Sequence, residues 1–510
     1  MLAKVFSGAT LGLESVLVEV EVDVTEKGLP AFMMVGLPGK AVEEAKERVR
    51  SAIKNSGLEF PRHKITINLS PADLPKEGPG YDLPIALGIL VAKGQIAADL
   101  SSSLVLGELS LDGSLRHTNG VLPLALLARE KKLVSLFLPA INAEEASIIK
   151  NLNVYPVKSL LQLISHLSQI ELIEKQKYLP FNQLKKSKEF EFDMADVSGQ
   201  EQAKRALEIV ASGAHNLLMT GPPGAGKTML ARTLPSILPE MTEKEALEVT
   251  RIYSITGNIP SGESIIKNRP FRSPHHTTSR IGLVGGGSKP APGEISLAHR
   301  GVLFLDEFPE FPRSVLESLR QPMEDGFVQI SRAKGTMTFP AKFLLIAASN
   351  PCPCGFLGSQ KKACVCLPGQ VTRYRKRVSG PILDRIDMHI SVPEVKIERL
   401  TKVKKSNESS KQIQKRVQLA RNKQLKRFGK FKSLIVANSE MSNKQVKRFC
   451  PLDASCRKLL NQIMARMNLS ARGYFRLIKV SRTIADLSDE ENIRTHHLAE
   501  AAQYRFVDYE

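Results

Sequence analysis

Blocks of alternating apolar and polar residues recur along the first third of the chain. VLVEVEVDV (16–24) and KITINL (64–69) repeat every two residues, which predicts β-strands with one buried face. Between such blocks, AVEEAKERVRSAIKNSG (41–57) and LPIALGILVAKG (83–94) have the apolar pattern of helices. Because strands and helices are interspersed, residues 1–168 are predicted to form an α/β domain.

The pattern changes after residue 168. Residues 169–192 include the Lys-rich stretch QKYLPFNQLKKSKEFEF and are predicted to form a linker. A second α/β region is predicted over residues 193–395, where a helical pattern precedes a hydrophobic strand, a Gly-rich turn and another helix. Residues 396–510 are helix-like throughout and are predicted to form a helical domain.

The composition indicates a globular protein with a basic surface. Apolar residues make up 42% of the 510 residues and charged residues 24%, and the formal net charge is +20. Such a charge indicates a polyanionic partner, most often nucleic acid, although a solvated basic surface explains it equally well. The N-terminal sequence lacks the apolar block of a signal peptide, and the longest apolar run is half of a membrane span. We therefore expect a cytoplasmic protein with no membrane partner and no disulfides.

One Gly-rich turn carries a strong chemical signal. It follows a hydrophobic strand and opens a helix, which is the context that a phosphate-binding loop requires. Its glycines let backbone N–H groups approach the phosphates of ATP, and the helix N-terminus adds a favourable dipole. Lys227 is expected to reach the β- and γ-phosphates, and Thr228 to hold Mg²⁺. The expected nucleotide-binding residues are Gly221, Pro222, Pro223, Gly224, Ala225, Gly226, Lys227 and Thr228.

Polar residues at the ends of two later hydrophobic strands complete the expected nucleotide site. GVLFLDE (301–307) ends in Asp306, an expected Mg²⁺ ligand, and in Glu307, which is expected to activate the attacking water. FLLIAASN (343–350) ends in Asn350, which would orient that water or would simply be a turn residue.

A third candidate for the nucleotide site is Arg385 in GPILDRID (380–387). Beside Asp384, a lone arginine would ordinarily form a surface ion pair of little energy. In a ring ATPase, the same arginine would be a finger that reaches the nucleotide bound by a neighbouring subunit.

Four of the six cysteines gather in NPCPCGFLGSQKKACVC (350–366), as two Cys-x-Cys pairs. Four thiolates in one loop suit a tetrahedral structural Zn²⁺, which would order a segment rich in Gly and Pro. The pairs are tighter than the usual Cys-x-x-Cys, so reduced free cysteines and a redox switch remain alternatives. The expected zinc ligands are Cys352, Cys354, Cys364 and Cys366.

Taken in order, GPPGAGKT, LFLDE, the strand tipped by Asn350 and DRID resemble the motifs of AAA+ ATPases. RPFRSPHHTTSRIGLVGGG (269–287) and SGPILDRIDMHI (379–390) resemble the magnesium-chelatase-like branch, and the whole chain resembles the ComM/YifB family. That resemblance implies an AAA+ P-loop α/β core followed by a C-terminal helical lid. It also implies a homo-hexameric ATPase that drives DNA branch migration during natural transformation. Its partners would be single- and double-stranded DNA and recombination proteins.

The resemblance also implies roles for particular segments. It places a helix-2 insert within residues 269–300, where we expect His275 and His276 to have structural roles. It makes FVQISRAKGTMTF (327–339) a hairpin before the Asn-tipped strand, with Arg332 and Lys334 as candidate DNA contacts, or else a solvated turn. Arg472 matches the sensor arginine of the lid, which contacts the γ-phosphate.

The N-terminal domain resembles the proteolytic domain of Lon. At the position of Lon's nucleophilic serine this chain has Gly80, and at the position of the catalytic lysine it has Leu124. A Ser–Lys mechanism needs both groups within hydrogen-bond reach, so the resemblance implies a retained fold without peptidase chemistry.

Two other functions compete with a DNA motor. A metal-chelatase motor subunit that remodels a partner protein would use the same nucleotide site. It is disfavoured by the net charge and by the N-terminal domain, which such subunits are expected to lack. A Lon-like peptidase is disfavoured by Gly80 and Leu124.

Overall fold

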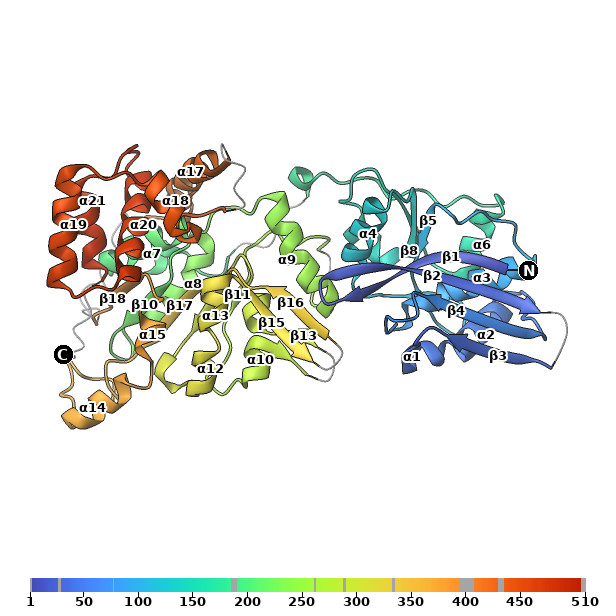
Figure 1. Cartoon of the computed structure of the whole chain (residues 1–510), viewed down its shortest axis with the longest axis horizontal. Coiled ribbons are helices and arrows are strands. Elements are labelled where there is room, and N and C mark those ends of the chain that lie inside the picture. The colour runs from blue at the N-terminus through green and yellow to red at the C-terminus, as the bar shows by residue number, and fades with distance from the viewer. Residues whose placement is uncertain are drawn as a thin grey trace. The chain divides into compact units, whose positions relative to one another are not determined.

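The computed structural model describes residues 2–25, 29–76, 78–184, 190–260, 263–287, 290–332, 335–394, 408–429 and 435–505. Its contacts divide the chain into two compact units (Figure 1). The first unit comprises Met1–Ser187 and Glu243–Ile266, and the second comprises Lys188–Thr242 and Lys267–Glu510. Each unit is described by itself.

The first unit is built on a seven-stranded mixed sheet with the order β3-β4-β2-β1-β5-β8-β9. The pairs β1/β2 and β2/β4 are antiparallel, and the remaining pairs are parallel. Its strands are β1 (Leu2–Leu11), β2 (Glu14–Thr25), β3 (Ala31–Val35), β4 (Lys64–Ser70), β5 (Ser103–Val105), β8 (Ser135–Pro139) and β9 (Asn153–Val157), and β6 (Glu108–Leu109) pairs separately with β7 (Leu115–Arg116). This sheet with its helices matches the α/β organisation expected for the N-terminal region.

Helices cover this sheet because their apolar faces need burial. The helix α3 (Asp82–Ala92) is buried at nearly every position and lies against β1 and β2. A Cβ at Gly88 would lie 2.5 Å from Cγ2 of Val22, so this close approach of helix and sheet requires glycine. The other helices are α1 (Lys40–Glu43), α2 (Ala45–Asn55), α4 (Val121–Glu130), α5 (Ala143–Ala146), α6 (Leu160–Leu167) and α9 (Glu243–Thr256).

Residues Glu243–Ile266 group with the first unit, although our expected domain boundaries assign them to the ATPase region at 193–395. The physical reason lies in α9, which buries Val249 and Ile252 and packs against α4. The carbonyl of Ser254 also accepts a hydrogen bond of 3.0 Å from the backbone N–H of Gly120. Apolar packing against α4 and a backbone hydrogen bond thus hold α9 in the first unit.

The second unit has a five-stranded, wholly parallel sheet with the order β11-β14-β17-β10-β18. These strands are β10 (Leu217–Thr220), β11 (Phe271–Arg272), β14 (Val302–Leu305), β17 (Leu344–Ser349) and β18 (Met388–Ser391). Two antiparallel hairpins pair β12 (Gly285–Gly286) with β13 (Ala291–Pro292), and β15 (Phe327–Arg332) with β16 (Gly335–Pro340). Around them lie α7 (Glu201–Gly213), α8 (Lys227–Ile237), α10 (Arg280–Val284), α11 (Glu294–Leu297), α12 (Arg313–Glu317), α13 (Arg320–Asp325), α14 (Pro368–Arg375) and α15 (Gly380–Leu383).

The C-terminal region is helical, as the sequence predicts. It comprises α17 (Ser410–Gly429), α18 (Asn443–Phe449), α19 (Ala454–Arg466), α20 (Ala471–Leu487) and α21 (Thr495–Gln503). These lid helices share one hydrophobic core with α7, α8 and the parallel sheet. The fold class, a parallel α/β core with a helical C-terminal region, is therefore confirmed. Within the described ranges, no helix is both long enough and apolar enough to cross a bilayer.

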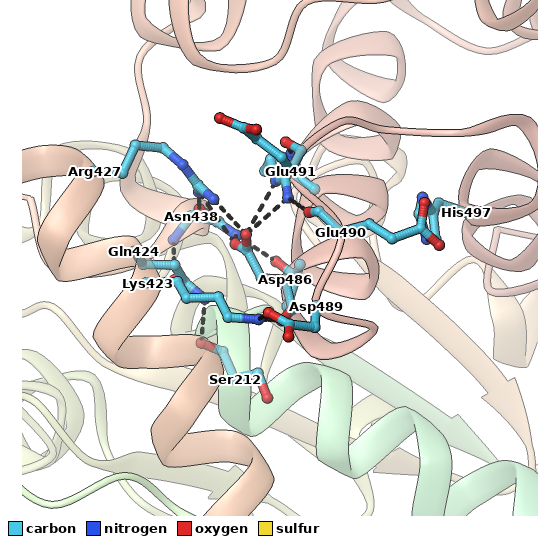
Figure 2. A network of polar contacts seen from close by, with 12 residues as sticks. Ser212, Lys423, Gln424, Arg427, Asn438, Asp486, Asp489, Glu490, Glu491 and His497 are labelled. Carbon is cyan, nitrogen blue, oxygen red and sulfur yellow. Dashed lines mark hydrogen bonds and ion pairs between the residues drawn. The ribbon is translucent and has the colours of Figure 1, made fainter.

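A buried polar network also joins the lid helices (Figure 2). The carboxylate of Asp486 on α20 accepts hydrogen bonds from Arg427 on α17, from Arg482 one turn away at 2.9 Å, and from Asn438 at 2.9 Å. The side chain of Gln424 extends the network by donating to the carbonyl of Ser212, at 3.0 Å, near the end of α7. Through these hydrogen bonds the Asp486 carboxylate holds α20 to α17 and to the short helical turn at Asn438.

Candidate nucleotide site and metal centre

The phosphate-binding loop connects β10 to the N-terminus of α8, as the sequence predicts. Gly224 and Gly226 have φ angles of 75° and 88°, which glycine adopts readily. The Nζ atom of Lys227 is turned into this loop and donates to the carbonyls of Gly221, at 2.6 Å, and Pro222, at 2.9 Å. Burial lowers the pKa of Lys227, and the charge of Asp306 acts in the opposite direction. Phosphate oxygens of a bound nucleotide can replace these two carbonyls as acceptors for the amine of Lys227.

The end of β14 brings a carboxylate to the first turn of α8. The hydroxyl of Thr228 donates to Oδ2 of Asp306 at 2.7 Å, and Oδ1 of Asp306 accepts from the backbone N–H of Glu307 at 2.9 Å. A hydroxyl and a carboxylate oxygen at this distance are hard ligands of the kind that Mg²⁺ prefers. Both residues therefore fit the metal role expected for them.

Asn350 follows β17, which lies between β14 and β10 in the sheet. Its Oδ1 accepts a hydrogen bond of 3.2 Å from Lys227 Nζ. The carboxyl ends of parallel strands meet at one edge of the sheet, so Asn350, Asp306 and the loop converge on one place. Their convergence fits the expected site, and the catalytic role of each remains a prediction.

Sequence reasoning missed the partner of Glu307. The Oε2 atom of Glu307 lies 3.0 Å from Nδ1 of His276, whose ring packs on His275 with centroids 4.1 Å apart. The pairing of β11 with β14 explains this contact, because the segment after β11 emerges beside the end of β14. Only that strand pairing could have revealed the contact, and two strand residues give little sequence signal for it.

Arg385 and Arg472 share one carboxylate. The Nη2 atoms of Arg385 and Arg472 lie 2.7 Å and 2.9 Å from the same oxygen, Oε1 of Glu324 on α13. The side chain of Arg385 is only 7% exposed and also donates to the carbonyl of Pro381, whereas that of Arg472 is 55% exposed. One carboxylate thus holds together the two arginines expected to act on the nucleotide, and their roles there stay predictions.

A buried ion pair fixes the helix that carries Arg472. Arg476, one turn further along α20, contacts Oδ1 of Asp387 at 2.5 Å, and Oδ2 of Asp387 accepts from the backbone N–H of Asn216 at 2.9 Å. Burial alone would raise the pKa of Asp387, but Arg476 and His215 hold it well below its usual range. The start of α20 is therefore anchored to the edge of the parallel sheet at which β10 and β18 begin.

The four cysteines come together as the sequence predicts. Sγ of Cys352 lies 3.4 Å from that of Cys354 and 3.6 Å from that of Cys364, and the backbone N–H of Cys354 donates to Sγ of Cys366 at 3.4 Å. All four sulfur atoms lie within 4.8 Å of one another. Tetrahedral zinc with metal–sulfur distances of about 2.3 Å places its sulfurs roughly 3.8 Å apart. The arrangement fits a metal centre with four cysteine ligands.

A further group, Glu490, His496 and His497, is a less suitable metal site. Nδ1 of His497 accepts a hydrogen bond of 3.0 Å from the backbone N–H of Arg494, so in the neutral ring the proton sits on Nε2. That Nε2 lies 3.5 Å from Oε1 of Glu490 and is positioned as a donor, not as a ligand. The group is better explained as a structural cap on α21.

Comparisons with known proteins identify the family of the chain. Residues 193–400 match the family described as magnesium chelatase, subunit ChlI, residues 20–142 match subunit ChlI of Mg-chelatase, and residues 407–505 match the ChlI C-terminal family. Competence protein ComM of Haemophilus influenzae is 45% identical over 507 residues, which cover 99% of this chain and 97% of that protein. The chain belongs to the ComM/YifB family of magnesium-chelatase-like AAA+ proteins.

Two other relatives differ in how much of the chain they match. The Escherichia coli protein YifB, described as uncharacterized, is 43% identical over 509 residues, or 99% of this chain and 97% of that one. The magnesium-chelatase 38 kDa subunit of Rhodobacter capsulatus is 27% identical over 179 residues, which cover 31% of this chain and 50% of that subunit. Membership of this AAA+ family implies ATPase activity and the use of ATP and Mg²⁺.

The hairpin expected before the Asn-tipped strand is present, with Arg332 of β15 opposite Gly335 of β16. Lys334 lies outside the described residues, and for Arg332 only the backbone is described. Their contact with DNA therefore stays a prediction.

Leu124 and Gly80, which the resemblance to Lon aligns with its catalytic dyad, both lie in regular secondary structure. Leu124 is buried in α4, and its Cδ2 lies 2.5 Å from where a Cβ at Gly8 of β1 would be. Gly80 lies in a short 3₁₀ turn, Pro79–Tyr81, directly before α3. Leu124 therefore serves packing, and the expectation of a domain without peptidase chemistry stays a prediction.

Proposed function

We propose that this chain forms a hexameric ATP-driven motor that migrates branched DNA in the cytoplasm and promotes integration of single-stranded DNA during natural transformation. The observation that carries the proposal is the convergence of Lys227, Thr228, Asp306 and Asn350 at one sheet edge, in a chain 45% identical over 99% of its length to a competence protein. The formal charge of +20 supports a polyanionic partner.

Each group at the site has a role in this proposal. Lys227 binds the phosphates of ATP, Thr228 and Asp306 hold Mg²⁺, and Glu307 accepts a proton from the attacking water, which Asn350 orients. Arg385 and Arg472 stabilise charge that develops on the γ-phosphate, and Arg385 does so for the neighbouring subunit. Zn²⁺ held by the four cysteines orders the loop that follows Asn350.

The test is three-stranded branch migration by the purified chain with ATP. Wild type should convert the branched substrate, and Lys227→Ala and Glu307→Gln should each abolish conversion. Glu307→Gln should still bind ATP, because the substitution removes the base but leaves the phosphate ligands in place. DNA unwinding or migration by Glu307→Gln at the wild-type rate would contradict the proposal.

A second candidate is a chelatase-type motor that remodels a partner protein. The observation in its favour is that all three matching families carry the name of magnesium chelatase. The two candidates differ in the effect of DNA on ATP turnover. Stimulation of ATPase activity by DNA supports the first, and a rate that DNA leaves unchanged supports the second.

A further inference from the structure

The first unit carries a basic groove that no motif in the sequence identifies. It lies at the edge of the seven-stranded sheet, where α2 meets the beginnings of β3 and β4, and it encloses about 490 Å³. Lys46, Arg50 and Lys54 line it from α2, and Phe32, Phe60 and Arg62 complete it. The three α2 residues are spaced four apart, so they project from one face of the helix.

Three exposed cations of α2 lie along this groove. Lys46, Arg50 and Lys54 are exposed, and within the described ranges none of them forms an ion pair with a carboxylate. By contrast Arg48, on another face of the same helix, is neutralised by Asp82 at 2.6 Å. Like charges four residues apart repel one another on a helix, so an anion bound along this row would relieve their repulsion.

Two aromatic rings beside these cations indicate what kind of anion the groove would bind. Phe32 and Phe60 are half-buried against the core of the unit, and the guanidinium of Arg50 lies 6.0 Å from the centroid of Phe60. Cations beside ring faces are the combination that binds single strands, where phosphates contact the charges and bases contact the rings. Successive cations at a rise of about 6 Å along α2 also match a repeating phosphate backbone better than a compact anion.

We propose that this groove binds the sugar–phosphate backbone of single-stranded nucleic acid, which gives the N-terminal unit a direct part in handling DNA. The inference rests on the proposed DNA function and adds a second contact surface to it. The groove contains one acidic residue, Glu59, among several cations, so its field attracts phosphates along its length.

The experiment uses the full chain and a fluorescent oligothymidine, with anisotropy measured over a series of salt concentrations. The triple variant Lys46→Gln/Arg50→Gln/Lys54→Gln should bind more weakly than wild type. The slope of log affinity against log salt should become shallower by about 2, at roughly 0.7 for each of three lost phosphate contacts. A matched control, Lys131→Gln/Lys150→Gln/Lys158→Gln, removes equal charge from exposed positions of the same unit and should leave the slope unchanged.

ATP turnover without DNA serves as the check on folding and should be equal in all three proteins. If wild type does not bind the oligonucleotide, the proposed DNA function fails. If wild type binds and both triple variants weaken equally, or neither does, the groove inference is overturned while the DNA function stands. Competition by inorganic triphosphate as strong as that by the oligonucleotide would assign the groove to small polyphosphates. Loss of ring assembly with unchanged DNA affinity would assign it to a protein contact, and either result refutes our proposal.

Discussion

Removing the negative charge of Asp486 should destabilise the second unit. Asp486→Asn keeps the shape of the side chain but leaves Arg482, whose side chain is 2% exposed, and Arg427 without their counter-ion (Figure 2). Removing one partner of a buried ion pair costs about 3–5 kcal/mol, because the remaining charge stays desolvated. Arg482 keeps hydrogen bonds to the carbonyls of Glu490 and Glu491, so we expect a value near the lower limit.

Thermal unfolding of the full chain measures this effect. A loss of about 3 kcal/mol at roughly 2 °C per kcal/mol lowers the midpoint of the second unit by about 6 °C. The matched control is Asp489→Asn, which breaks an ion pair with Lys423 at a residue that is 87% exposed. The control should show no resolvable shift, because surface ion pairs contribute little. Equal midpoints for Asp486→Asn and Asp489→Asn would refute the idea that this carboxylate holds α20 to α17.

Four further outcomes follow from the sites. Cys354→Ser should lose about one bound zinc per chain, measured by elemental analysis of freshly purified protein, and unchanged zinc would exclude the four-cysteine centre. His276→Leu should lower kcat of ATP hydrolysis roughly tenfold with KM unchanged, because the imidazole of His276 contacts Glu307 and is not expected to bind ATP; an altered KM alone would contradict this. Glu324→Gln should lower KM for ATP several-fold. In wild type the γ-phosphate would compete with the Glu324 carboxylate for Arg385 and Arg472, and the substitution weakens that competition. A raised KM would contradict this. Because the pKa of Asp387 is depressed, its charge contributes stability above about pH 4 that is lost at lower pH; Asp387→Asn should lose less stability on acidification than wild type does.

The nucleotide site was accessible to sequence reasoning because its parts are local or meet at a predictable edge. β10, the loop that begins at Gly221 and α8 form a strand–loop–helix unit whose geometry follows from adjacent residues. Asp306 reaches Thr228 because both follow parallel strands of one sheet. The cysteine cluster could also be predicted, because a short loop brings Cys352 near Cys364.

Contacts that depend on long-range pairing were not accessible. The contact between His276 and Glu307 follows from the pairing of β11 with β14, and β11 has only two residues with no distinctive pattern. The shared carboxylate Glu324 joins elements far apart in the chain and has no motif. The grouping of Glu243–Ile266 with the first unit was also missed, because an amphipathic helix fits many α/β surfaces equally well.

The excursion of Glu243–Ile266 has a practical consequence for dissecting the protein. The chain leaves the second unit shortly after α8, the helix that begins with Lys227, and re-enters it at Lys267. A cut at the linker therefore does not separate the two units. A fragment ending at residue 187 would lack the helix that covers α4, and the complementary fragment would carry α9 with its apolar face uncovered. The few residues between α8 and α9 also join the P-loop helix covalently to the first unit, so a displacement of α8 would be passed to that unit through a short stretch of chain.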